Sequence, residues 1–154
     1  MTASILLFAV GNESRGDDAL APLLLRGLEG WAETAGHIEL IEDYQLQVEH
    51  VTDLVGRSAI LFIDADVSCA APFHFSRINS EHDHSYTSHA MTPSALLHTF
   101  RKVYGSDAPP TFVLRIRGYD FELGNPLSGE AAENLAMASA KVREWVADIS
   151  SAQE

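Results

Sequence analysis

The chain has 154 residues, with 22 Asp and Glu against 10 Lys and Arg, a net charge of −12 with neutral histidines. This length predicts a single domain over residues 1–154. The acidic balance argues against a nucleic-acid binder, which needs a basic face, and against docking on an anionic membrane. The single cysteine, Cys69, excludes an internal disulfide and favours the cytoplasm. We expect neither a signal peptide nor a membrane span.

Apolar runs alternate with amphipathic stretches along the whole chain. The continuous runs at 5–10 and 59–63 predict strands that are buried on both faces. A helix with an apolar stripe is expected after Asp17 and Asp18, and Gly30 is expected to end it. Three further strands are predicted, at 38–41, 73–78 (an edge strand) and 111–116. Further helices are predicted over 46–54, from Thr92–Pro93 with Tyr104 on the inner face, and after the loop 118–129. A polar loop is expected at 79–88.

This alternation predicts an α/β three-layer sandwich, with a mostly parallel twisted sheet of about five strands flanked by helices. In open sheets of this kind, ligands bind beyond the carboxyl ends of the strands. That rule selects two loops, 11–18 after the first strand and 64–68 after the third. If those strands are neighbours, the carboxylates of the two loops converge.

The acidic residues in these loops have two interpretations. Asp17 and Asp18 are placed to cap the following helix. Asp64 follows a buried strand, where a carboxylate must be paired, hydrogen-bonded or metal-bound. The first loop does not match the glycine pattern of a dinucleotide-binding turn, and two acids stand where a P-loop has Gly-Lys-Ser/Thr, so a nucleotide site is not expected.

Histidines supply the remaining candidate ligands. His89 lies just before the helix that starts at Thr92. Two carboxylates and an imidazole suit a divalent metal with open positions, and the same groups suit acid–base chemistry. His82 and His84 have a composition that suits metal binding, although such pairs in polar loops are commonly solvated.

Taken in chain order, these segments resemble the hydrogenase maturation proteases, which trim the C-terminus of the large subunit of [NiFe] hydrogenases. The resemblance covers nearly the whole chain and rests on four blocks. They are the apolar strand with Gly11-Asn12 and Asp17-Asp18, Phe62-Ile63-Asp64-Ala65, Ser88-His89, and the late loop 118–128. Two positions where the family often has glycine are Ala9 and Ala21, and neither removes a proposed ligand.

The resemblance implies roles for five residues. Asp18 and Asp64 are the expected catalytic acids, and with His89 they are the expected ligands of nickel that is already seated in the substrate. Gly11 and Asn12 are expected to support the first loop. The implied partner is the nickel-loaded large-subunit precursor, and we expect a cytoplasmic monomer.

Three questions stay open at this point. The acids act on water either directly, as a base and acid pair, or through the metal. Glu13 adds a carboxylate to the first loop, either as a further ligand or facing water. The alternative functions are a non-enzymatic nickel carrier that uses His82, His84 and His89, and a hydrolase resembling the peptidyl-tRNA hydrolases. That family's Thr-Arg-His-Asn segment is absent from this sequence.

Overall fold

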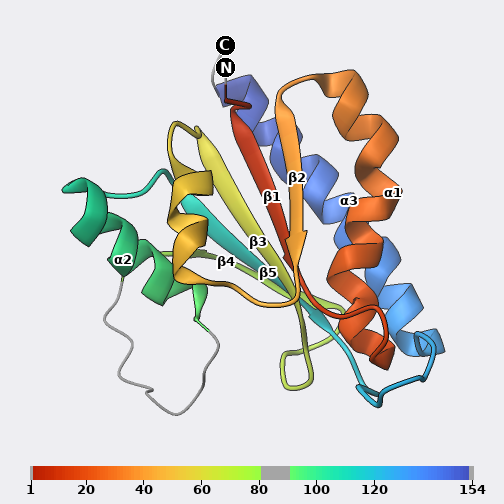
Figure 1. Ribbon diagram of the computed structural model, residues 1–154. Helices are drawn as coiled ribbons and strands as arrows, with labels where there is room; N and C mark the ends of the chain where they lie inside the picture. Colours follow the sequence, from red (N-terminus) through yellow and green to blue (C-terminus); the bar gives the residue numbers. More distant parts are fainter. Residues whose placement is uncertain (1, 81–90, 153–154) are drawn as a thin grey trace.

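Five strands form one sheet in the computed structural model, which describes residues 2–80 and 91–152. The strand order is β2-β1-β3-β5-β4, and every pairing is parallel except that of β4 with β5 (Figure 1). The predicted α/β sandwich is therefore confirmed. The strands are β1 Ile5–Val10, β2 Ile38–Asp43, β3 Ala59–Asp66, β4 Phe73–Ile78 and β5 Thr111–Arg117. The helices are α1 Leu20–Ala35, α2 Pro93–Tyr104 and α3 Gly129–Ala152, with 3₁₀ turns η1 Gly16–Ala19 and η2 Val48–Leu54.

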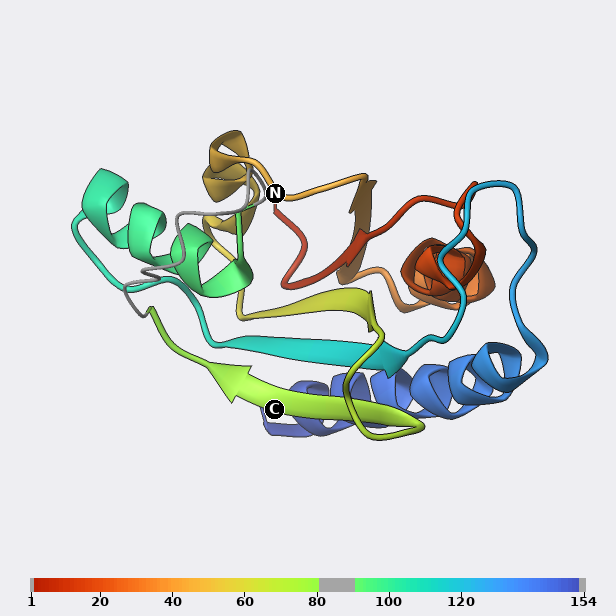
Figure 2. The same ribbon diagram turned by 90° about the horizontal axis from the view of Figure 1, so that it is seen from below.

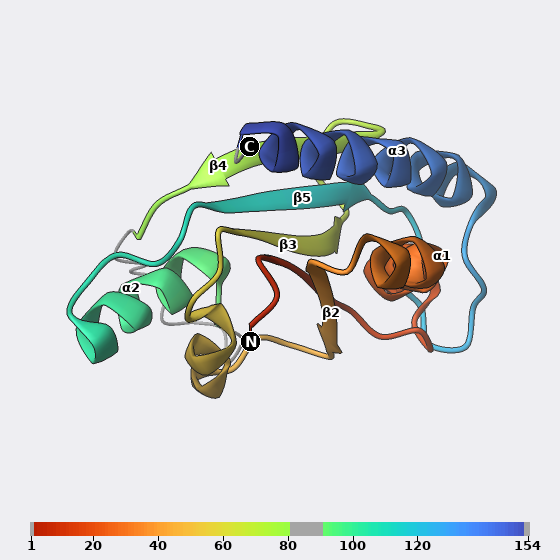
Figure 3. The ribbon, with the colours of Figure 1, turned by 90° about the horizontal axis from the view of Figure 1, so that it is seen from above.

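Helices cover both faces of the sheet (Figure 3). On one face, α1 and α3 pack against alternate strand residues such as Leu7 and Ile63. On the other face, η2 and α2 pack against the intervening residues, among them Phe8 and Phe62. Because both faces are covered, β1 and β3 consist of continuous apolar runs. The alternating pattern of 73–78 belongs to β4, which is an edge strand as predicted.

The strands run further toward their carboxyl ends than the apolar runs suggest. β3 does not end at Ile63 but continues to Asp66, and Asp64 pairs with Arg115 of β5 in the register. A strand ladder is made by backbone groups, so it continues past the point where side chains become polar. Asp64 therefore projects from a strand rather than from a loop.

Two expectations about α1 are wrong. The helix does not end at Gly30 but runs to Ala35, where Gly36 takes a left-handed conformation with φ +80°. Ala32 beyond Gly30 is still buried against the core, so packing favours another turn of helix. Neither Asp17 nor Asp18 caps a helix, because the N-cap positions of η1 and α1 carry no side-chain hydrogen bond.

The α2 region largely agrees with the prediction. The helix starts as expected, with the Thr92 hydroxyl accepting a hydrogen bond from the Ala95 amide. Tyr104, expected on the inner face, is exposed, although its ring contacts Phe100 with centroids 4.6 Å apart. The helix expected over 46–54 is the 3₁₀ turn η2. Most of the predicted polar loop at 79–88 lies outside the described residues.

Candidate active site

The first loop and the end of β3 meet at the carboxyl edge of the sheet, which faces the viewer in Figure 2. β1 and β3 are parallel neighbours, with Ala9 opposite Ile63. The chain leaves β1 through residues 11–15 and enters η1, which carries Asp18, while Asp64 is the next residue of β3. The two strands are therefore neighbours, which is the condition on which the expected convergence of the carboxylates depends.

Gly11 and Asn12 hold Asp18 in place. The Asn12 amide donates a hydrogen bond to Asp18 Oδ2 at 2.9 Å. A Cβ on Gly11 would lie 2.2 Å from the carbonyl oxygen of Asp18, so only glycine allows this close approach. The Asn12 side chain accepts from the Ser14 amide and closes a local turn. Both residues are thus placed to support the loop.

Asp18 is half-buried, and burial raises the pKa of its carboxyl group. The hydrogen bond from Asn12 and the charge of Arg15 oppose this effect without cancelling it. A carboxylate with a raised pKa accepts a proton more readily than one in open water.

The structure brings Asp64 into electrostatic contact with Asp18. Although Asp64 is an exposed residue, desolvation of its carboxyl group and the Asp18 charge raise its pKa to about 7, and Asp66 adds to the effect. A hydrogen bond from the Ala65 amide and the charge of Arg115 act in the opposite direction. The two carboxyl groups therefore interact, and Asp64 holds its proton more tightly than a free carboxyl group does. Neighbouring carboxyl groups of unequal pKa suit acid–base chemistry.

Asp17 has a structural role that the sequence did not reveal. Its carboxylate is fully buried and accepts hydrogen bonds from the amides of Tyr119, Asp120 and Ser128 and from the Ser128 hydroxyl. Burial alone raises the pKa of Asp17, but these bonds outweigh it and hold the pKa below its ordinary value. Asp17 therefore fixes the loop 118–128 beside the first loop. These donors lie more than 100 residues away, so no local pattern indicates them.

Asn134 of α3 also went unpredicted. It is buried, and its side-chain amide donates to the Arg117 carbonyl at 3.0 Å and to the Tyr119 hydroxyl at 3.1 Å. The Arg117 guanidinium lies over the Tyr119 ring and donates to the Cys69 carbonyl. This cluster joins α3 to the loops that follow β3 and β5.

Two cavities flank the acids. One of about 250 Å³ is lined by Asp64 and Asp66 together with apolar side chains such as Phe62 and Met91. Asp66 accepts hydrogen bonds from the amide and hydroxyl of Ser68, which outweigh the effect of burial and lower its pKa. The carboxyl group of Asp64 thus borders a partly apolar cavity.

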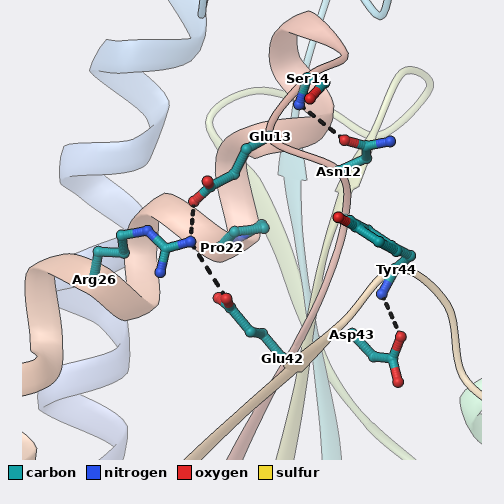
Figure 4. Close-up of a pocket in the computed structure, with 9 residues that line it drawn as sticks. Asn12, Glu13, Ser14, Pro22, Arg26, Glu42, Asp43 and Tyr44 are labelled. Atoms are coloured by element: carbon teal, nitrogen blue, oxygen red, sulfur yellow. Dashed lines mark hydrogen bonds and ion pairs between the residues drawn. The ribbon is translucent and has the colours of Figure 1, made fainter.

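The other cavity, of about 350 Å³, lies between the first loop, α1 and the end of β2 (Figure 4). Arg26 crosses its wall and pairs with Glu13 at 2.5 Å and with Glu42 at 3.3 Å. Glu13, which the sequence allows as a ligand or as a water-facing residue, is an ion-pair partner of Arg26 in the structure. Tyr44 lines the same cavity and is largely exposed.

The histidines of the predicted metal site are not described. His89, His82 and His84 lie in residues 81–90, outside the described residues. Within 2–80 and 91–152, no group of three His, Cys, Asp or Glu side chains is arranged to hold a metal ion. Asp18 and Asp64 contribute two oxygen donors, a type of ligand that divalent cations accept. In the same part of the chain, no helix is long and apolar enough to cross a membrane.

Comparison with known proteins identifies solved structures that have the same fold. No protein-family model and no curated protein matches the sequence. Among solved structures, the hydrogenase maturating endopeptidase HybD from E. coli is similar, with a TM-score of 0.72, 19% identity and coverage of 96% of this chain and 93% of that one. The chain has the fold of the hydrogenase maturation proteases.

Other proteins with this fold match over similar lengths. The [NiFe] hydrogenase maturation protease HycI from Thermococcus kodakarensis gives a TM-score of 0.68 at 19% identity, covering 96% of this chain and 92% of its own. A hydrogenase 2 maturation peptidase from a thaumarchaeon gives 0.66 at 18% identity, covering 92% and 97%. The maturation protease fold thus accounts for nearly the whole chain.

Proposed function

We propose that this chain is an endopeptidase that removes a C-terminal peptide from the nickel-loaded large-subunit precursor of a [NiFe] hydrogenase. One observation carries the proposal. Asp18 and Asp64 come together at the carboxyl edge of a sheet that has the hydrogenase maturation protease fold. We also propose that the protein is a cytoplasmic monomer.

The chemistry assigned to this pair is hydrolysis of one amide bond. The ionised carboxylate takes a proton from water as the water oxygen attacks the scissile carbonyl carbon. The protonated partner gives its proton to the amide nitrogen when the C–N bond breaks. Because the pKa of Asp64 is raised to about 7, Asp64 suits the role of proton donor and Asp18 that of base.

Nickel enters this proposal as part of the substrate. Asp18, Asp64 and His89 are the groups of this chain assigned to engage it, and the metal supplies Lewis acidity when present. Two carboxylates on rigid elements support this assignment, because such groups are fixed before the substrate arrives. The proposal therefore requires that nickel-free precursor is a poor substrate.

The test uses purified protein with nickel-loaded and nickel-free precursor, and mass spectrometry of the products. We expect release of a C-terminal peptide from the nickel-loaded form and an intact nickel-free form. Equal cleavage of both forms contradicts the role of nickel. If Asp64→Asn leaves trimming intact while changes at His82 and His84 abolish nickel binding, the chain is a carrier rather than a peptidase.

A further inference from the structure

Four large apolar side chains are exposed in the loops around the two acids. Tyr44 follows β2 and is 75% exposed, and Val67 follows β3 and is 60% exposed. Tyr119 and Leu123, in the loop after β5, are 38% and 63% exposed. Because β2, β3 and β5 are parallel, all three loops lie at the carboxyl edge seen in Figure 2. We call these four residues the apolar rim.

Hydrogen bonds and one shared cavity connect the loops of the rim to one another and to the first loop. The Gly118 amide, next to Tyr119, donates to the Asp66 carbonyl, next to Val67. The Gly124 amide, next to Leu123, donates to the Ser14 carbonyl of the first loop at 2.7 Å. Tyr44 and residues 11–14 line one cavity, as Figure 4 shows. The rim therefore borders the loop that presents Asp18.

The rim is held in place before any partner arrives. Asp17 fixes the loop that carries Tyr119 and Leu123 through the amides of Tyr119, Asp120 and Ser128. The Asp43 carboxylate accepts the Tyr44 amide at 2.7 Å and lies 3.2 Å from His50 Nε2. Exposed apolar groups on fixed loops lose little conformational entropy on binding, which favours a role in association.

Carboxylates stand next to three of the rim residues in the chain and restrict the kind of partner. Glu122 is exposed next to Leu123, and Asp43 and Asp66 stand directly before Tyr44 and Val67. A partner surface that matches this pattern is apolar, with basic side chains opposite the acids. The net charge of −12 favours such a partner over an acidic one.

We propose that the apolar rim is the docking surface for the folded body of the protein substrate, which presents an apolar patch edged by basic residues. This inference rests on the proposed function, because it assumes that the substrate is a protein. Small peptides that reach only the two acids would miss most of the rim. Docking contacts that bind the substrate and the transition state equally lower KM and leave kcat unchanged.

The experiment compares serine variants of the rim with matched exposed residues elsewhere. The rim variants are Tyr44→Ser, Val67→Ser and Leu123→Ser, singly and combined. The controls are Val55→Ser and Val103→Ser, which remove side chains that are 43% and 59% exposed near the opposite edge of the sheet. For each variant, far-ultraviolet circular dichroism checks the fold. Cleavage of nickel-loaded precursor gives kcat and KM, and a titration gives the Kd for the precursor.

We expect each single rim variant to raise KM and Kd about 3- to 10-fold, and the combined variant to raise them more. The kcat of the rim variants, and the kcat, KM and Kd of both controls, should stay within about twofold of the wild type. Added salt should raise KM further, because it screens the acids. Rim variants that match the controls in Kd, or that lose kcat at unchanged KM, overturn the inference. If the wild type binds precursor through the rim but releases no peptide, the proposed function is wrong and the docking surface is supported. If the wild type does not bind precursor at all, the docking surface is wrong.

Discussion

Asp17 and Asp18 are neighbours in the chain, yet their carboxyl groups have opposite environments. Hydrogen bonds from a distant loop outweigh burial and lower the pKa of Asp17, whereas burial outweighs a single backbone hydrogen bond and a nearby arginine and raises that of Asp18. Asp17 therefore stabilises the fold, and Asp18 remains available for chemistry. The two residues should respond differently to the same substitution.

We expect Asp17→Asn to destabilise the protein by about 2–4 kcal/mol, because a buried amide cannot accept all the hydrogen bonds that the carboxylate accepts. The measurement is urea unfolding at neutral pH. Since the native pKa of Asp17 lies below its unfolded value of 3.8, this stabilisation is present above that pH and disappears as the pH falls through the native pKa. Wild-type stability at neutral pH in the variant would contradict the assigned role.

We expect Asp18→Asn to fold normally and to lose at least about 100-fold in cleavage of nickel-loaded precursor, because it removes one member of the proposed catalytic pair. Stability should change by less than about 1 kcal/mol, since the side chain makes one backbone hydrogen bond. Asp107→Asn is the control, because Asp107 is an exposed acid paired with Arg101. An Asp18→Asn enzyme with normal kcat would remove Asp18 from the mechanism.

Asp64→Asn should change the pH dependence of stability. The native pKa of about 7 lies above the unfolded value of 3.8, so the folded wild-type protein holds the Asp64 proton more tightly. The free energy of unfolding therefore falls as the pH rises from about 4 to 7. The Asp64→Asn variant has no carboxyl group at this position, so it does not lose stability over this pH range. We expect it to be about 1–2 kcal/mol more stable than wild type at pH 8, after allowance for screening of an exposed residue, and equal at pH 4. Thermal unfolding at several pH values measures the gap, and a gap that does not change with pH contradicts the raised pKa.

Gly11→Ala should both destabilise the protein and impair cleavage, since the added methyl group would meet the Asp18 carbonyl oxygen at 2.2 Å. We expect a loss of about 2 kcal/mol or more and at least a tenfold fall in kcat/KM. The matched control is Gly27→Ala in α1, where a Cβ meets nothing within 4 Å. That change should stabilise the helix by about 0.5–1 kcal/mol and leave cleavage unaltered. Normal cleavage by Gly11→Ala would show that the loop can move without cost.

The sequence predicted the sheet well because its signals are local. The apolar runs of β1 and β3 indicate strands covered on both faces, and the alternation of apolar and polar residues in β4 indicates a strand covered on one face. The strand-end rule then selected the two loops that contain Asp18 and Asp64, and the resemblance to the maturation proteases singled out these two acids. In the structure, the charge of Asp18 acts on Asp64. The positions of Gly11 and Asn12 beside Asp18 match the support expected of them.

The features that the sequence missed depend on contacts between distant segments. Gly30 has the composition of a helix end, but buried Ala32 beyond it favours a further turn. Asp17 has the position of a helix cap, but its donors come from residues 119, 120 and 128. Asn134 is a polar residue on an amphipathic helix, and nothing local shows that it bonds to the turn after β5. The histidine ligands remain predictions.

The bonds from Asp17 to Ser128 join positions 111 residues apart, and this has a consequence for synthesis. A nascent chain that has emerged only as far as α2 already contains Asp18 and Asp64, yet it lacks every donor that satisfies Asp17. A buried carboxylate without donors is costly, so the first loop cannot settle until β5 and the loop after it have been made. The first loop that carries Asp18 is therefore completed late, with the last quarter of the polypeptide, and a chain truncated after α2 lacks the bonds that hold it.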